Sequence, residues 1–304
     1  MTQPPRLFDR ELHRQRLERA ARQGGRADFL RRRVAEDLAQ RLAAIHRRFP
    51  LAVELGARGG DFAQALAESD AAGKIDTLIQ ADLSPAMLAR GQGPRVAADE
   101  ARLPFAPASL DLVVSALALH WVDDLVGALI QARLALRPDG LFLGALIGGA
   151  SLTELRQCLT EAEIEIAGGA GPRVSPFLDA YDGAALMQRA GFALPVVDVD
   201  KVVVRYEHPL RLVADLRAMG ETNVLLERPR TPLTRPVLAR ATALYQERFG
   251  APDGRVPATF EIITLTGWAP HPDQQQPLRP GSAKTRLADA LHVREQQTGD
   301  KATP

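Results

Sequence analysis

The chain has 304 residues, enough for one large α/β domain or two smaller ones. A chain of this length can bury a core that is stable without a disulfide or a structural metal. Its 38 basic and 37 acidic residues give a formal net charge of +1, so bulk charge favours neither nucleic acid nor an anionic membrane as a partner. The single cysteine, Cys158, excludes an intrachain disulfide and a cysteine-based zinc cage, and it is typical of a reducing compartment.

The sequence gives no sign of an export signal or of a segment for membrane insertion. Residues 1–25 lack an apolar core, so we expect no signal peptide. The longest apolar run, at 141–150, is too short to cross a bilayer and contains three glycines. We therefore expect no membrane span.

Residues 1–50 are predicted to form an N-terminal helical segment. Apolar residues recur at helical spacing within 6–48, as at Leu30, Val34 and Leu38, and Pro50 ends the pattern. The outer faces of these one or two helices are rich in arginine.

From residue 51 to 150, short apolar runs alternate with helical stretches. The runs are 51–55, 75–81, 95–98, 110–116 and 141–147, and the helix candidates are 60–69, 85–91 and 123–137. Strands that are apolar on both faces and separated by helices indicate a parallel sheet covered on both sides. This is a doubly wound, mostly parallel α/β core.

Residues 151–268 are predicted to complete the fold, with a helical insertion at about 207–250. Ser151 followed by Glu154 has the spacing of a capping box for the first helix of this part. The remaining elements expected are a helix at 182–192 that Gly191 stops, a strand at 195–206, a helical region at 209–249 interrupted by Pro229, Pro232 and Pro236, and a strand at 258–268. Residues 269–304, rich in proline and glutamine, are predicted to be a poorly ordered tail.

The loop after the first predicted strand reads "LAVELGARGGDF", and acidic residues follow the next two strands. Glu54 precedes Gly56 and Gly60, Asp82 ends the second strand, and Asp99 and Glu100 follow the third. The carboxyl ends of parallel strands meet at one edge of a sheet, where α/β proteins bind ligands. Glycines there let the backbone approach a ligand without a Cβ in the way.

This ordered set resembles the class I S-adenosylmethionine-dependent methyltransferases, which have a Rossmann-like seven-stranded sheet. The resemblance implies that the loop lies close to the methionine part of S-adenosylmethionine, that Asp82 accepts the ribose hydroxyls and that Asp99 accepts from the adenine amino group. The cofactor-binding residues expected on this basis are Glu54, Gly56, Ala57, Gly60, Asp82, Leu83, Asp99, Glu100 and Ser115.

Other roles are open for several of these residues. Asp82 or Ser84 could instead cap the helix that begins at Pro85, and Asp99 could be a solvated loop carboxylate. Arg58 stands where the methyltransferase loop usually has its middle glycine. Its cation would lie near the sulfonium of the cofactor, unless the side chain turns outward to pair with Glu54 or Asp61.

His120 and Trp121 follow the fourth strand and are the candidates for catalysis. His120 could orient an acceptor or take a proton, and Trp121 could face the sulfonium as a cation–π partner. The alternative is that both are packing residues under the helix at 123–137.

Several further segments resemble a narrower group, the methyltransferase-fold assembly factor of respiratory complex I and its bacterial counterparts. They include "FDR" at 8–10, "SALALHWVDDL" at 115–125, "MGETNVLLER" at 219–228 and "DGRVPATFEIITLTGW" at 253–268. The resemblance implies hydroxylation of an arginine on the quinone-site iron–sulfur subunit of complex I. The malonyl-carrier-protein O-methyltransferase of biotin synthesis shares the core pattern but not "MGETN" or "VPATFEI".

Two alternatives to arginine hydroxylation remain at this level: methylation of a small or carrier-bound carboxylate, and a non-catalytic, cofactor-binding assembly chaperone. Hydroxylation ordinarily uses iron held by two histidines and a carboxylate, but His271, Asp273 and His292 all lie in the predicted tail, so no metal site is predicted. We expect a cytoplasmic protein in a bacterium, or a mitochondrial matrix protein in a eukaryote.

Overall fold

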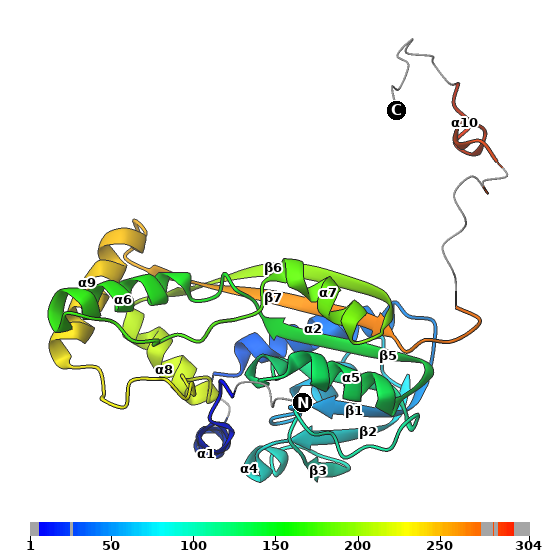
Figure 1. The fold of residues 1–304 in the computed structure, drawn as a ribbon, viewed down its shortest axis with the longest axis horizontal. Helices are drawn as coiled ribbons and strands as arrows, with labels where there is room; N and C mark the ends of the chain where they lie inside the picture. Colours follow the sequence, from blue (N-terminus) through cyan, green and yellow to red (C-terminus); the bar gives the residue numbers. More distant parts are fainter. Residues whose placement is uncertain (1–5, 25–26, 275–281, 283–284, 295–304) are drawn as a thin grey trace. The chain divides into compact units, whose positions relative to one another are not determined.

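A seven-stranded sheet organises residues 1–270 of the computed structural model, with strand order β3-β2-β1-β4-β5-β7-β6 (Figure 1). The strands are β1 (Phe49–Leu55), β2 (Ile75–Asp82), β3 (Arg95–Ala97), β4 (Leu110–Ala116), β5 (Leu136–Ile147), β6 (Ala193–Tyr206) and β7 (Val256–Trp268). Strands β1 to β5 pair in parallel, whereas β7 is antiparallel to β5 and β6. The predicted doubly wound, mostly parallel fold is confirmed.

The structure describes residues 6–24, 27–274, 282 and 285–294. The helices of residues 1–270 are α1 (Arg10–Ala21), α2 (Phe29–Ala43), α3 (Asp61–Ala67), α4 (Pro85–Leu88), the 3-10 turn η1 (Leu119–Trp121), α5 (Leu125–Ala135), α6 (Thr153–Ala167), α7 (Ala180–Arg189), α8 (Pro209–Met219) and α9 (Arg235–Phe249). Residues 271–304 form a separate unit that contains α10 (Leu287–Ala290), and much of the predicted tail lies outside the described residues.

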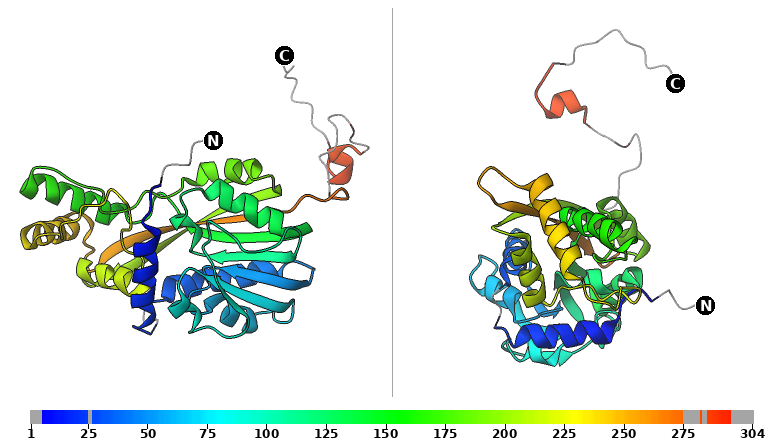
Figure 2. Two further views of the ribbon diagram at one scale, coloured as in Figure 1. Left: turned by 60° about the horizontal axis from the view of Figure 1, so that its bottom comes forward. Right: turned by 90° about the vertical axis from the view of Figure 1, so that its left-hand side faces the viewer.

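The central strands are apolar on both faces because helices cover both (Figure 2). On one face Leu112 and Val114 of β4 pack in a core with α2, and on the other Val113 packs with α5 and α7. Adjacent strand residues point to opposite faces, so a strand between two helical layers needs a continuous apolar run.

The N-terminal helix and the late helices lie together at the carboxyl end of the sheet. Helix α1 contacts α4 and α8, and α6 packs against α9 (Figure 2). A bridge between Phe8 and Leu225 ties the segment before α1 to the connection between α8 and α9. Segments about two hundred residues apart in the sequence are therefore brought to one edge.

The predicted capping box at Ser151 and Glu154 is wrong. Helix α6 begins at Thr153 without a side-chain cap. The Ser151 hydroxyl instead donates to the carbonyl of Glu261 at 3.2 Å, and Glu154 accepts from the hydroxyl of Thr259. Both polar side chains thus bind β7, because a tertiary partner is present that the local pattern does not reveal.

Proline positions also differ in part from the prediction. The region 220–234 separates α8 from α9, as Pro229 and Pro232 indicate. Pro236, however, lies in the first turn of α9 rather than interrupting a helix. The first turn of a helix has no hydrogen bond for a proline to remove, so the residue is well placed there.

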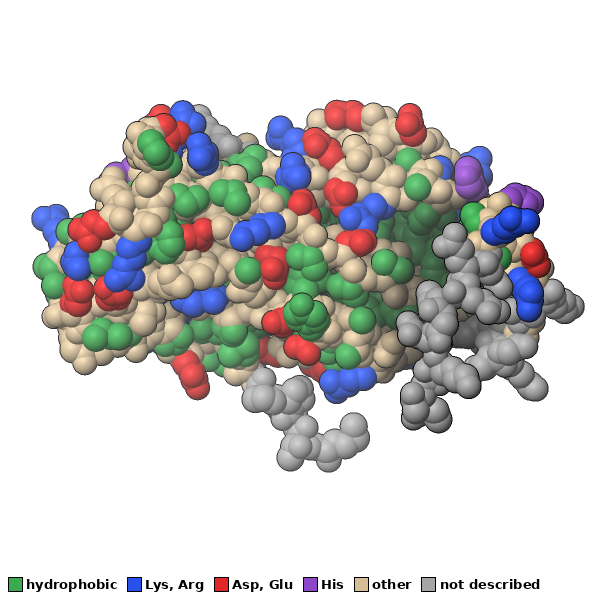
Figure 3. Space-filling model, turned by 90° about the horizontal axis from the view of Figure 1, so that it is seen from above, with side chains coloured by type: hydrophobic (Ala, Val, Ile, Leu, Met, Phe, Trp, Pro, Cys, Tyr) green, Lys and Arg blue, Asp and Glu red, His purple; other side chains and the backbone are tan. Residues whose placement is uncertain are grey.

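Strand β6 forms one edge of the sheet. Its exposed valines, such as Val199 and Val203, alternate with the charged side chains of Asp198, Asp200 and Lys201. Acidic and basic side chains are interspersed with apolar ones over the face in Figure 3. Charges of this kind discourage pairing of an edge strand with another chain.

Candidate functional site

The loop after β1 contains two glycines that the packing requires. Gly56 has φ +68°, and a Cβ on it would lie 2.1 Å from the Cβ of Ala118. Gly60 has φ +87° and precedes α3, with Nε2 of Gln80 3.0 Å from the position of a Cβ. Ala57 between them is buried. Close packing therefore accounts for both glycines independently of any ligand.

Arg58 lies in the same loop and turns inward. Its side chain is fully buried and its φ is 51°, a conformation that costs a non-glycine residue on the order of 1–2 kcal/mol. Its backbone N–H and Nη1 donate to Oδ2 of Asp82 at 2.8 and 3.1 Å, and its Nη2 lies 3.7 Å from Oε1 of Glu221. The alternative in which Arg58 turns outward to pair with Glu54 or Asp61 is wrong, because the carboxyl groups of buried Asp82 and half-buried Glu221 attract the guanidinium inward.

Asp82 ends β2, and both of its carboxylate oxygens have donors. Oδ1 accepts the backbone N–H of Ser84 at 2.7 Å, while Oδ2 receives the two bonds from Arg58. The Ser84 hydroxyl caps α4 by accepting the N–H of Met87 at 3.2 Å. Capping is therefore the role of Ser84, and the present partner of Asp82 is an arginine. Leu83, between Asp82 and Ser84 in the sequence, is half-buried.

Helix α1 brings a second arginine to the acidic residues after β3. Arg10 Nη2 donates to Oδ1 of Asp99 at 2.6 Å and to Glu100, and its Nη1 donates to the carbonyl of Trp121 at 3.1 Å. Burial raises the pKa of Glu100, although the charges of Arg10 and Arg58 act in the opposite direction. Within the described residues, Oε1 of Glu100 has no hydrogen-bond donor. Asp99 is thus an ion-pair partner and not a free loop carboxylate.

Glu221, in the turn after α8, joins both catalytic candidates. Its Oε2 accepts the indole N–H of Trp121 and lies 3.4 Å from Nε2 of His120. Burial alone would raise the pKa of Glu221, but the hydrogen bond and charge of His120 and the charge of Arg58 outweigh it and lower the pKa to about 2. The carboxylate therefore stays ionised at neutral pH.

His13 of α1 completes the cluster around Trp121. The two rings are 5.0 Å apart between centroids, and Phe8 packs edge-on against the indole at 5.4 Å. Burial, helped by the charge of Arg58, lowers the pKa of His13 well below its ordinary value, so this ring stays neutral. Trp121 thus packs against α1 and the segment after α8, rather than under α5 as the packing alternative supposed.

Glu54 and Ser115 lie in the strands rather than in the loops. The Ser115 hydroxyl donates to the carbonyl of Leu55 at 3.1 Å and so links β4 to β1. Glu54 is fully buried, and burial together with the nearby Asp61 raises its pKa well above the ordinary value. Neither of its carboxylate oxygens has a well-formed hydrogen bond within the described part of the chain.

Arg10, His13 and Glu221 are site residues that sequence reasoning missed. Arg10 ends the string "FDR" and Glu221 lies in "MGETN", so both were within motifs of the resemblance, but no role followed from either motif. Their positions beside Trp121 depend on how α1 and α8 pack, which residue spacing does not indicate.

A cavity of about 1160 Å³ opens beside this cluster. His120, Trp121 and Glu221 lie on its wall, whereas the acidic side chains after β2 and β3 do not. Glu221 is therefore shared: it faces Arg58 on one side and borders the cavity on the other. A substrate in the cavity would contact the same carboxylate that now attracts the chain's own guanidinium.

The residue types at this edge fit S-adenosylmethionine. Adenosine offers hydroxyl and amino donors, and Asp82, Asp99 and Glu100 offer acceptors in the order expected along the sheet edge. The Oε1 atom of Glu100 and the carboxylate of Glu54 are buried acceptors without a well-formed bond, which a ligand would relieve. Arg58 and Arg10 bind these acids, so a ligand that used the same carboxylate oxygens would displace the two guanidinium groups.

The described residues contain neither a cluster of metal-binding side chains nor a helix suited to span a membrane. No group of three His, Cys, Asp or Glu side chains is placed to hold a metal ion among them, His271, Asp273 and His292 included. None of their helices combines the length and the apolar character needed to cross a bilayer.

Comparison with known proteins gives consistent matches. Residues 53–144 match the family model described as "Methyltransferase domain". The chain is 37% identical to "Arginine-hydroxylase NDUFAF5, mitochondrial" of Danio rerio, over 96% of this chain and 92% of the relative. It is 34% identical to "Malonyl-[acyl-carrier protein] O-methyltransferase" of Halorhodospira halophila, over 86% of this chain and 88% of the relative. A crystal structure from Bacillus halodurans, assigned as a methyltransferase, superimposes with a TM-score of 0.53 at 16% identity, covering 78% of this chain and 99% of the other.

The sheet topology, the loop after β1 and the acidic residues after β2 and β3 define a protein of the class I methyltransferase fold. Within that class the chain belongs to the family of the arginine-hydroxylase NDUFAF5 proteins, which it matches along nearly its whole length. The predicted superfamily and the predicted narrower family are both confirmed.

Proposed function

We propose that this protein acts in the assembly of respiratory complex I by hydroxylating an arginine of the quinone-site iron–sulfur subunit. The reaction class is that of the family to which the chain belongs. One observation in the site supports it: Glu221 borders the cavity and faces the guanidinium of Arg58 at 3.7 Å. A carboxylate that holds an arginine of its own chain has the charge and shape to hold the arginine of a substrate.

The reaction replaces one C–H bond of the substrate arginine by C–OH. An oxidant of the dioxygen class would supply the oxygen atom. An external reductant of the dihydronicotinamide or dihydroflavin class would supply the two electrons that, with two protons, reduce the second oxygen atom to water. In this proposal Glu221 fixes the guanidinium, and His120, which lies 3.4 Å from that carboxylate, orients the substrate or moves a proton.

We further propose that S-adenosylmethionine is the cofactor and that it binds at the acidic edge. Asp82 would accept from the ribose and Asp99 and Glu100 from the adenine side, with Glu54, Gly56, Ala57, Gly60, Leu83 and Ser115 forming the rest of the lining. When bound, this cofactor supplies an electrophilic methyl group on a sulfonium. The compartment would be that of complex I assembly, which is the cytoplasm in a bacterium and the mitochondrial matrix in a eukaryote.

Mass spectrometry of the quinone-site subunit tests the proposal. The subunit would be purified from cells that lack the gene, from cells that carry it, and from deletion cells complemented with Glu221→Gln or with the control Arg189→Gln, which is exposed on α7. We expect one arginine to lack an oxygen atom in the deletion and in the Glu221→Gln strain only. An unchanged subunit together with normal complex I content would contradict the proposal.

Methyl transfer to a carboxylate is the second candidate. It is favoured by the 34% identity to a malonyl-carrier methyltransferase and by the arginines around the cavity, which could hold a carboxylate. A methyl group missing from the subunit in the deletion would instead indicate protein methylation. A subunit that is chemically unchanged while complex I content falls would favour the non-catalytic chaperone.

A further inference from the structure

The wall of the large cavity has a strong excess of positive charge. Seven of the described side chains that line it are arginines, and two are carboxylates, Asp28 and Glu221. The chain as a whole is nearly neutral, at +1, so the arginines are concentrated at this place. A concave surface of one sign attracts ligands of the other.

Both carboxylates on the wall have arginine partners, and three of the seven wall arginines have carboxylate partners of their own. These three are Arg31, Arg173 and Arg228, which pair with Asp28, Glu163 and Asp9. Asp28 pairs with Arg31 at 2.8 Å and with Arg90 at 3.2 Å. Glu221 faces Arg58, which lies outside the cavity wall. Neither acid therefore offsets the remaining arginines that border the cavity.

Three exposed arginines of the wall have no carboxylate partner within the described part of the chain. They are Arg19 on α1, Arg217 on α8 and Arg230 in the connection to α9, and all three are exposed. They come from three separate segments around the cavity, so the positive charge is spread over its rim. Such a distribution suits several anionic groups on one ligand better than a single one.

Arg16 marks the most crowded part of the rim. Burial and the charges of Arg228 and Arg19 lower its pKa, so the three guanidinium groups repel one another. Arg16 donates to the carbonyl of Asn223, and Arg228 donates to that of Leu225 at 2.7 Å. Arg228 also pairs with Asp9 at 3.3 Å. Arg16 and Arg228 are thus held in place by backbone carbonyls and one carboxylate, and an anionic ligand would relieve the repulsion that remains.

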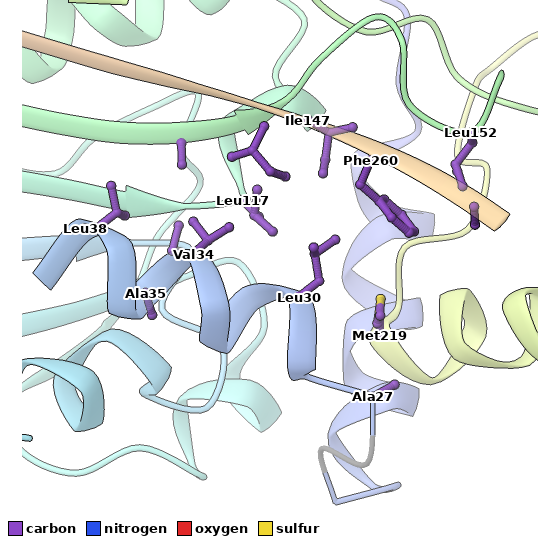
Figure 4. Close-up of a cluster of buried hydrophobic side chains, with 14 of the residues drawn as sticks. Ala27, Leu30, Val34, Ala35, Leu38, Leu117, Ile147, Leu152, Met219 and Phe260 are labelled. Atoms are coloured by element: carbon purple, nitrogen blue, oxygen red, sulfur yellow. The ribbon is translucent and has the colours of Figure 1, made fainter. Parts of the chain in front are cut away.

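The interior of the cavity is apolar. Leu30, Leu117, Ile147, Met219 and Phe260 point toward a common space in Figure 4 and belong to the wall. These side chains come from α2, the residue after β4, the end of β5, α8 and β7. A ligand for this cavity therefore combines an apolar part with negative charges.

We propose that the cavity and its arginine rim bind an acidic segment of the partner protein, with an apolar side chain against the inner wall and carboxylates on the rim. The volume, about 1160 Å³, exceeds the ~300–1,000 Å³ of ordinary small-molecule sites, which favours a peptide. The inference rests on the proposed function only in taking the partner to be a protein. It adds that acidic residues of that protein, and not only its arginine, are recognised.

Fluorescence anisotropy tests this with a short labelled peptide of alternating glutamate and leucine, and with its lysine and leucine counterpart. We expect the acidic peptide to bind the full chain, the basic one not to bind, and the affinity to fall as salt is added. The double variant Arg19→Glu, Arg217→Glu should lose affinity roughly tenfold or more, while Arg189→Glu, an exposed arginine outside the cavity, should change it little. These positions are exposed, and thermal unfolding of each variant would verify that it folds.

Equal binding of the two peptides, or equal affinity of the double variant and the Arg189→Glu control, would overturn the inference. Complete displacement of the peptide by octanoate at lower concentrations would overturn it too, in favour of a fatty acid as ligand. Peptide binding does not depend on turnover. A peptide that binds as expected beside an unmodified subunit would therefore contradict only the proposed function, whereas a modified subunit without peptide binding would contradict only this inference.

Discussion

Two neighbouring regions of this protein differ in how their charges are matched. At the acidic edge of the sheet, Asp82, Asp99 and Glu100 are each paired with an arginine of the same chain, Arg58 or Arg10. On the rim of the cavity, Arg19, Arg217 and Arg230 lack acidic partners within the described residues. The first region is closed by the chain itself, and the second is left for a ligand to neutralise. The paired arginines of the acidic edge must therefore shift before a ligand can reach the carboxylates, whereas the unpaired arginines of the cavity rim can bind an anionic ligand directly.

The largest effect is expected from removing the buried cation. Arg58→Met should destabilise the fold by about 3–5 kcal/mol, because it leaves buried Asp82 without its ion-pair partner. Arg58→Gly should lose about 1–2 kcal/mol less than Arg58→Met, since glycine relieves the strain at φ 51°. Urea unfolding would measure both.

Arg33→Met is the matched control for the buried pair. Arg33 pairs with Asp200 at 3.1 Å on the surface, where both side chains are more than half exposed, so its loss should cost less than about 1 kcal/mol. Equal losses of unfolding free energy for Arg58→Met and Arg33→Met would show that the buried pair stabilises the fold no more than an exposed pair. That result would contradict the contrast drawn between the two regions.

Asp82→Ala should produce the next largest change, in this case in cofactor affinity. We expect binding of S-adenosylhomocysteine to weaken by about 1.5–3 kcal/mol, which is roughly ten- to a hundredfold in Kd, because a charged acceptor is removed. Isothermal titration calorimetry would measure it, with circular dichroism as a check on folding. Unchanged affinity would remove Asp82 from the proposed cofactor site.

Acidification should then give an effect on the order of 2 kcal/mol through Glu221. The pKa of this carboxyl is lowered to about 2 in the folded protein, from an ordinary 4.5. Its contribution to stability is therefore complete above pH 4.5 and is lost as the pH falls toward 2. Between these values the parent should lose more stability than Glu221→Gln, in unfolding measured at each pH. Parallel curves for the two proteins would show that Glu221 is not held ionised by its neighbours.

Much of the fold follows from local patterns in the sequence. A buried parallel strand needs an apolar run, and the residues that start or stop a helix lie within a few positions of its end. The acidic residues of the edge could be predicted for the same reason, because Asp82 ends one strand and Asp99 follows the next strand closely. Arg58 shows the limit, since its inward orientation depends on Asp82 and on the distant Glu221. The wrong capping box at Ser151 has the same cause, because β7 provides partners that the local sequence does not show.

The direct measurement of the relation between Arg58 and the cofactor is a calorimetric titration of the parent and of Arg58→Met with S-adenosylhomocysteine. If the guanidinium of Arg58 must leave Asp82 before the cofactor binds, its removal should tighten binding in the variant, provided circular dichroism shows it folded. We expect a lower Kd for Arg58→Met than for the parent. A higher Kd in a folded variant would show that Arg58 is itself a cofactor ligand, and would contradict the view that this arginine closes the acidic edge.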